Sequence, residues 1–165
     1  MVRGVSEIYL IRHARAVDNA SNDWERELTA DGWREARAVG AALKQAGVQL
    51  DAVIASPLVR AVQTATLIAI ELGLDDGITI DRALVPEGNT NAMISVACQA
   101  GGARVALVGH EPSMGQLLSD LVGRPGMSLV KAGVVKLTID DAPSRGAAKL
   151  AWTLSPRHLV PQIAR

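Results

Sequence analysis

The sequence predicts a three-layer α/β domain, in which helices cover both faces of a mostly parallel sheet. Short apolar segments alternate along the chain with longer segments of helical periodicity. The chain has 165 residues, the size of one domain, and 48% of them are apolar, so a substantial core can form. No repeat, low-complexity tract or linker divides the chain, and we expect a single domain over residues 1–165.

Two strand–helix units are predicted in the first half of the chain. Residues 5–11 form the first apolar strand, and a polar loop follows it. Thr29 is expected to cap the next helix, which ends before a glycine. The second strand, D-A-V-I-A-S, leads into Ser56 and Pro57. A serine followed by proline is typical of an N-cap and a first helical position, so a helix is expected from about residue 57 to 72.

In the second half of the chain, predicted strands and helices again alternate, and the last two predicted elements are both strands. I-T-I-D-R-A-L is a weaker strand, residues 90–100 are helical in pattern, and A-R-V-A-L-V-G is a clean apolar strand. Pro112 is expected to open another helix, which ends near Gly123. G-V-V-K-L-T-I-D and A-K-L-A-W-T-L should form a final antiparallel pair joined by D-A-P-S-R-G-A.

Composition excludes several classes of protein. Seventeen basic and seventeen acidic residues give zero net charge, which argues against binding to nucleic acid or to an anionic membrane. The single cysteine, Cys98, cannot form an internal disulfide and is expected in the core, because it lies in an apolar helical run. No apolar run is long enough to span a membrane, and Glu7 interrupts any N-terminal signal pattern. We therefore expect a cytoplasmic protein.

Polar residues follow each of the first four predicted strands. Arg12 and His13 follow the first strand, Arg60 lies in the first helical turn after the second, Glu87 follows the third and His110 follows the fourth. Ligands of open α/β sheets bind beyond the carboxyl ends of the parallel strands. These side chains are therefore expected to meet at one edge of the sheet.

Such a group would form a cationic pocket for a phosphoryl group. Guanidinium groups match phosphate oxygens, and the helix N-terminus at Ser56-Pro57 would add free N–H groups. Each motif alone has a more ordinary explanation: a strand end, a helix start, a strand-to-helix turn or a solvated acid. The order of these motifs in the sequence and their expected position at one edge of the sheet favour the phosphoryl-binding site.

Three motifs carry a resemblance to a known family. L-I-R-H-A, S-P-L-V-R-A-V-Q-T-A and V-A-L-V-G-H-E-P, in this order, resemble the histidine phosphatase superfamily and its phosphoglycerate-mutase-like fold. R-E-L-T-A-D-G, the short chain and the terminal A-W-T-L-S-P-R-H-L are similar to the small SixA-type phosphohistidine phosphatase branch. The resemblance spans nearly the whole chain. Ala14 departs from it, because the family usually has glycine there.

The resemblance implies a role for each matching residue. His13 would be the nucleophile and would form a phosphohistidine intermediate. Arg12, Arg60 and a protonated His110 would bind the phosphoryl oxygens, and Asn19 occupies a position where many members contact the phosphate. A neutral imidazole is a good nucleophile when its other nitrogen donates its proton, here to a backbone carbonyl. We expect no metal and no cofactor, and the chain has no metal-binding spacing such as H-E-x-x-H.

The general acid has three candidates. Glu87 is the best placed, with Glu111 beside His110 and Asp18 near the first motif as alternatives. Imidazole leaves as a much weaker base than an alkoxide, so a phosphohistidine substrate needs less help from an acid. A poorly defined acid therefore favours phosphohistidine.

Three functions remain open from the sequence. The first is a phosphatase of protein phosphohistidine, and the second is a phosphomonoesterase of small phosphorylated metabolites on the same fold. The third, a non-catalytic phosphate-binding module, would not need a nucleophile. A Ser–His hydrolase fits worse, because Ser113 lacks the glycine two residues before it. Short segments after each strand predict a shallow, open pocket that a protein-borne phosphohistidine could reach, and so could small esters. His158 is expected on the surface beyond the last strand.

Overall fold

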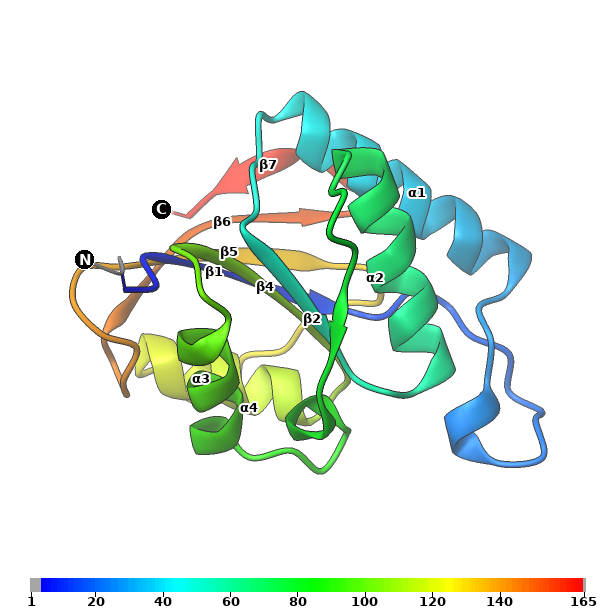
Figure 1. The fold of residues 1–165 in the computed structure, drawn as a ribbon, viewed down its shortest axis with the longest axis horizontal. Coiled ribbons are helices and arrows are strands. Elements are labelled where there is room, and N and C mark those ends of the chain that lie inside the picture. The colour runs from blue at the N-terminus through cyan, green and yellow to red at the C-terminus, as the bar shows by residue number, and fades with distance from the viewer. Residues whose placement is uncertain (1–3, 165) are drawn as a thin grey trace.

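The computed structural model describes residues 4–164 and arranges them in three layers (Figure 1). Within these residues one sheet has the strand order β3-β2-β4-β1-β5-β6-β7. The strands are β1 (Glu7–Arg12), β2 (Ala52–Ala55), β3 (Thr79–Ile80), β4 (Arg104–Gly109), β5 (Val134–Ile139), β6 (Ala148–Ser155) and β7 (His158–Ile163). The helices are α1 (Ala30–Gln45), α2 (Val59–Leu72), α3 (Thr90–Gln99) and α4 (Ser113–Val122), with 3-10 turns η1 (Asp23–Glu25) and η2 (Arg82–Leu84).

The expected α/β architecture is confirmed. Strands β3, β2, β4 and β1 are parallel and form the centre and one side of the sheet, while β5, β6 and β7 continue it in antiparallel pairing. Helices α1 and α2 cover one face, and α3 and α4 cover the other (Figure 1). Each face has its own apolar cluster, one packed against α1 and α2 and one against α3 and α4. Alternating side chains of β1 show the division, because Ile8 and Leu10 join one cluster and Tyr9 and Ile11 the other.

The start of α2 differs from the prediction. The helix begins at Val59, its N-cap is Leu58, and no side chain caps it. Ser56 and Pro57 instead form the turn that leaves β2, and the Ser56 hydroxyl accepts a hydrogen bond from the N–H of Leu58 at 3.3 Å. A serine hydroxyl can satisfy a nearby N–H in a turn as well as at a cap, and the local sequence does not distinguish the two uses.

Two strands also differ from the prediction. The weak third strand is confined to Thr79–Ile80, because Asp81 turns the chain into η2 by accepting a hydrogen bond from the N–H of Ala83 at 2.8 Å. The sequence analysis missed β7, which places His158 at the start of an exposed edge strand. Pro161 lies inside β7 and hides the strand pattern, since proline is tolerated in sheets mainly at edges.

The expected burial of Cys98 is wrong, because its side chain is exposed. Helix α3 buries Met93 and Ala97, four positions apart on one face. Cys98 follows Ala97 directly and is therefore rotated about 100° away from that face. Across residues 4–164, no helix is both long enough and apolar enough to cross a membrane.

A close contact links the start of α1 to the chain that leaves β1. The Thr29 hydroxyl caps α1 as predicted, by accepting from the N–H of Gly32 at 3.0 Å, and the Thr29 N–H donates to the Arg15 carbonyl at 3.0 Å. A Cβ atom at position 32 would lie 2.0 Å from the same Arg15 oxygen. Glycine is therefore required at position 32 for this approach, which fixes the segment just after His13.

We predict that Gly32→Ala destabilises the protein. Glycine to alanine inside a helix ordinarily gains about 1 kcal/mol, whereas the backbone clash here should cost about 1–3 kcal/mol of the unfolding free energy. Urea denaturation followed by circular dichroism measures the change. Gly4→Ala serves as the control, because a Cβ there has no neighbour within 4 Å. A Gly32→Ala variant as stable as the parent would show that the contact does not constrain the fold.

Candidate active site

Two histidines leave adjacent parallel strands at the same edge of the sheet. Arg12, the last residue of β1, pairs with Gly109, the last residue of β4. His13 and His110 follow these residues, so their rings come together with centroids 5.1 Å apart. The sequence predicted this meeting from strand order, and the register of β1 against β4 produces it.

The ring of His13 is held in one tautomer. Its Nδ1 lies 2.7 Å from the carbonyl oxygen of Ala14 and donates its hydrogen there, which leaves a lone pair on Nε2. The predicted hydrogen bond to a backbone carbonyl is thereby confirmed. Burial lowers the pKa of His13 to about 4, and the positive charges of Arg60 and Arg12 act in the same direction. His13 is therefore neutral near pH 7.

His110 is more strongly constrained. Its Nε2 lies 2.8 Å from the Ser56 hydroxyl. That hydroxyl can donate to Nε2, and this arrangement places the His110 proton on Nδ1. Burial lowers the pKa of His110 to about 3, with further effects from His13 and Arg60. The expected protonated His110 is thus not the state of the free protein, although a neutral ring can still donate from Nδ1.

Arg60 extends from the first turn of α2 and is almost completely buried. Its two terminal nitrogens bind one residue of η1: Nη1 donates to the Asp23 carbonyl at 2.6 Å and Nη2 to the Asp23 carboxylate at 3.0 Å. Arg12 donates from Nη1 to the carbonyl of Leu129 at 2.9 Å. Both guanidinium groups are therefore oriented by the protein itself.

Three buried nitrogen atoms are left without a hydrogen-bond partner among the side chains of residues 4–164. They are Nε of Arg12, Nε of Arg60 and Nδ1 of His110. Buried polar groups in proteins nearly always have partners, so each such atom needs an explanation. All three belong to residues that the sequence predicts to bind a phosphoryl group, whose oxygens accept hydrogen bonds from such donors.

The structure does not bring Glu87 or Asn19 into this group. Both side chains are exposed, Glu87 in the turn after η2 and Asn19 in the loop after β1. Within the described part of the chain, neither side chain forms a hydrogen bond or an ion pair with His13, Arg60 or His110. Their assigned roles remain predictions.

The other two candidate acids have different positions. The Glu111 carboxylate accepts a hydrogen bond from the N–H of Leu129 at 2.9 Å. The carbonyl of Leu129 in turn accepts a hydrogen bond from Arg12. Glu111 therefore fixes the segment that orients Arg12. The Asp18 side chain is fully exposed and lies 3.8 Å from Arg26.

Sequence reasoning missed three residues that support the site. Asp23 lies in a polar loop, and no spacing in the sequence indicates that it reaches Arg60. Ser56 was interpreted as a cap. Thr64 accepts a hydrogen bond from the N–H of Ala14 at 3.1 Å and donates to the carbonyl of Arg60 at 2.7 Å. Its position four residues after Arg60 on α2 was the one available signal.

Comparisons with known proteins agree with this geometry. A family model described as the histidine phosphatase superfamily (branch 1) matches residues 8–85. The chain is 31% identical over 148 residues to a phosphohistidine phosphatase SixA homolog of Haemophilus influenzae, covering 83% of this chain and 90% of the relative. It is 27% identical over 157 residues to phosphohistidine phosphatase SixA of Escherichia coli, covering 93% and 96%.

A solved structure shares the whole fold. The protein histidine phosphatase SixA complexed with tungstate superposes with a TM-score of 0.83 and 27% identity, over 93% of this chain and 99% of that one. Tungstate is a tetrahedral oxyanion, as inorganic phosphate is. The chain belongs to the histidine phosphatase superfamily and is a phosphatase of its SixA-like group.

Proposed function

We propose that this phosphatase removes the phosphoryl group from a phosphohistidine of another protein, in the cytoplasm, with His13 as its nucleophile. The observation that carries the proposal is the cluster of three buried, unpartnered nitrogens around a neutral imidazole whose Nε2 is free. SixA proteins, which this chain resembles over most of its length, are phosphohistidine phosphatases by name.

The reaction proceeds in two displacements. In the first, Nε2 of His13 attacks phosphorus and the phosphorus–nitrogen bond of the substrate breaks. The substrate ring reacts with a proton on its other nitrogen, so it takes the electron pair of the broken bond and leaves as neutral imidazole. Arg12 and Arg60 bind the phosphoryl oxygens, and His110 donates to one of them from Nδ1. In the second, water attacks phosphorus, the bond to His13 breaks, and inorganic phosphate is released.

Binding of the phosphoryl group changes the charge of the site. In the free protein, the positive charges of Arg12 and Arg60 contribute to the low pKa values of the two site histidines. A bound dianion offsets the arginine charges and raises both histidine pKa values, because an opposite charge favours the protonated form. His110 then becomes a better donor in the complex than in the free protein.

The carboxylates of the site favour phosphohistidine over phosphate esters. Asp23 binds Arg60, and hydrogen bonds from Arg26 and Arg60 keep the pKa of its carboxyl below the ordinary value. It therefore remains an anion that holds Arg60. Glu111 is engaged by the backbone of Leu129 and Glu87 is exposed. An imidazole leaving group tolerates the lack of a strong acid far better than an alkoxide does.

We predict that His13→Ala abolishes hydrolysis of phosphohistidine and leaves the fold intact, because His13 follows a strand end. Rapid quench with a ³²P-labelled phosphohistidine peptide should trap acid-labile label on the parent protein and none on the variant. Arg145→Ala is the control, since Arg145 is exposed in the β5–β6 loop at the opposite end of the sheet. Turnover by His13→Ala at the parent rate would overturn the mechanism.

We predict that Glu87→Gln slows ester hydrolysis much more than phosphohistidine hydrolysis. If Glu87 is the acid, the loss on an aliphatic phosphate ester should be about 100- to 10,000-fold, and on phosphohistidine less than about tenfold. The ratio of the two rates in one preparation cancels errors in enzyme concentration. Equal losses would indicate that Glu87 positions the phosphoryl group. A parent enzyme faster on small esters than on any phosphohistidine protein would favour the metabolite phosphatase.

We predict that tungstate binds at the four basic residues and changes two of the three histidines. In NMR titrations of the free protein, His13 and His110 should protonate at about pH 4 and pH 3. Tungstate should raise both values by adding negative charge nearby. His158, on β7, provides the internal control and should not respond. A response at His158 alone would place the oxyanion elsewhere.

A further inference from the structure

A basic groove lies beside His13 and takes no part in the proposed chemistry. Its volume is about 460 Å³, and four segments form it: the chain after β1, helix α1 through Glu35, the chain before β5, and the turn between β6 and β7. Its basic side chains are Arg15, Lys131, Arg157 and His158. All four are exposed.

The groove is joined to the active site through two segments. Arg15 is two residues from His13, and the N–H of Ala132 donates to the His13 carbonyl at 3.1 Å. Lys131 precedes Ala132, and its charge contributes to the low pKa of His13. The groove therefore lies near His13, where the residues around a substrate phosphohistidine can reach it.

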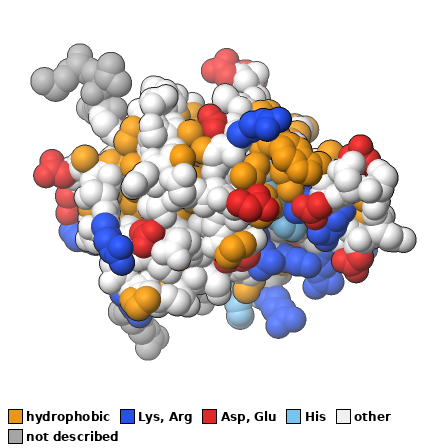
Figure 2. All heavy atoms as spheres, turned by 90° about the horizontal axis from the view of Figure 1, so that it is seen from below, with side chains coloured by type: hydrophobic (Ala, Val, Ile, Leu, Met, Phe, Trp, Pro, Cys, Tyr) orange, Lys and Arg blue, Asp and Glu red, His pale blue; other side chains and the backbone are white. Residues whose placement is uncertain are grey.

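The positive charge of the groove is largely uncompensated. Arg15 pairs with Glu35 at 2.9 Å. Lys131 and Arg157 form no ion pair with any residue between 4 and 164. The chain as a whole is neutral, so this is a local excess. Figure 2 shows Lys and Arg side chains gathered next to histidine surface at one end of the molecule.

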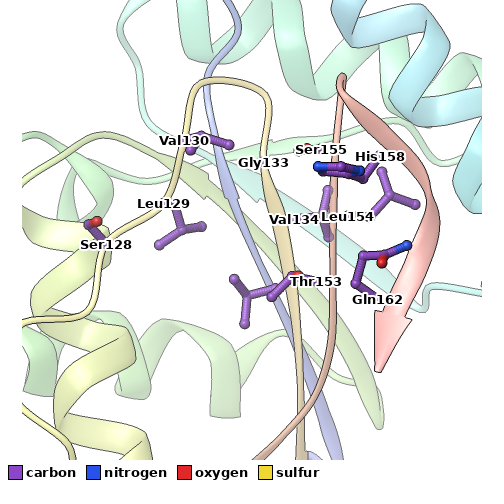
Figure 3. A pocket seen from close by; sticks show the side chains of 11 residues that line it. Ser128, Leu129, Val130, Gly133, Val134, Thr153, Leu154, Ser155, His158 and Gln162 are labelled. Atoms are coloured by element: carbon purple, nitrogen blue, oxygen red, sulfur yellow. The ribbon is translucent and has the colours of Figure 1, made fainter. Parts of the chain in front are cut away.

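A second groove of about 250 Å³ continues the first (Figure 3). The two share Val130, Ser155 and His158. The second is more apolar, with Leu129 and Val134 among its lining residues, and it lies between the chain before β5 and the β6–β7 hairpin. The side chain of Val130, at the junction, is 61% exposed.

We propose that the basic groove binds acidic residues next to the phosphohistidine of the substrate protein, while the adjoining apolar groove receives an apolar side chain of the same segment. This inference rests on the proposed function and names the partner chemistry: an acidic, partly apolar segment that carries phosphohistidine. Charge complementarity supplies the recognition, as positive patches attract and orient acidic partners. Arg12, His13, Arg60 and His110 bind the phosphoryl group, and the groove binds the residues that flank it.

A pair of peptides tests the proposal. Both carry one phosphohistidine and one leucine, and they differ in having glutamate or lysine at the flanking positions. N-phosphoimidazole is the small substrate without flanking residues. We expect the parent protein to hydrolyse the glutamate peptide with the higher kcat/KM, mainly through a lower KM. The preference should weaken as salt is raised, because the groove is exposed to solvent.

Arg157→Glu reverses one charge of the groove outside the catalytic group. We expect it to lower kcat/KM for the glutamate peptide by about tenfold and to leave N-phosphoimidazole hydrolysis unchanged. Arg157→Gln should give a smaller loss in the same direction. Arg145→Glu makes the same charge change in the β5–β6 loop, at the opposite end of the sheet, and should have no effect. Thermal melts check that all variants are folded.

The outcomes separate the two proposals. If the parent hydrolyses both peptides equally well, or if Arg157→Glu and Arg145→Glu behave alike, the groove does not select acidic segments and this inference is wrong. If the parent hydrolyses neither peptide nor N-phosphoimidazole but does hydrolyse phosphate esters, the proposed function fails and the docking inference fails with it. A preference for the glutamate peptide that Arg157→Glu removes supports both.

Discussion

The concentration of positive charge at one edge of the sheet is the constraint on which the rest of the site depends. Two guanidinium groups and two imidazoles meet there, and most of their atoms are buried. Removing charged groups from water is costly unless they gain partners, typically by several kcal/mol for each ion. The protein meets this cost in three ways. It pairs Arg60 with Asp23, it gives Arg12 a backbone carbonyl, and it keeps both histidines neutral.

Neutral histidines and oriented arginines are also what the chemistry needs. A protonated His13 would have no lone pair to attack phosphorus, so burial and the nearby positive charges, which lower its pKa, suit the nucleophilic role proposed for it. The Ala14 carbonyl then decides which nitrogen carries the proton. In the proposed mechanism, the same two arginines, whose charges help to lower the histidine pKa values, also bind the phosphoryl group. The negative charge of a bound phosphoryl group reduces the repulsion between the two guanidinium groups, so binding of the group and reduction of this repulsion occur together.

The support for these four residues comes from backbone contacts far apart in the sequence. Thr64 joins the segment after β1 to α2, Glu111 fixes the backbone at Leu129, and Gly32 lets α1 approach the Arg15 carbonyl. Because each contact acts on the main chain, it positions a side chain it does not touch. The R-E-L-T-A-D-G motif has this physical meaning: the threonine caps the helix and the glycine permits the close approach.

Much of the fold could be predicted because it depends on local patterns. Apolar runs of strand length, the Thr29 cap and the order of the units were sufficient for the three layers and for the common edge of His13 and His110. The predictions that were wrong depend on tertiary contacts. Ser56 contacts His110 instead of capping α2. Cys98 lies one residue after a buried position of α3, so its side chain points away from the core. Asp23 reaches Arg60 across 37 residues of sequence, and no periodicity reports such a contact.

The exposed position of Glu87, the leading candidate for the acid, and the open groove favour the same kind of substrate. A small phosphate ester would need a proton donor at its leaving oxygen, and walls to hold the rest of the molecule. Asp23, which binds Arg60, is already engaged as an anion by two arginines. The hollow beside His13 continues along the surface to the β6–β7 hairpin. A substrate with a good leaving group needs no strong proton donor, and a substrate with a large surrounding surface needs no enclosing walls. A phosphohistidine on a protein has both properties.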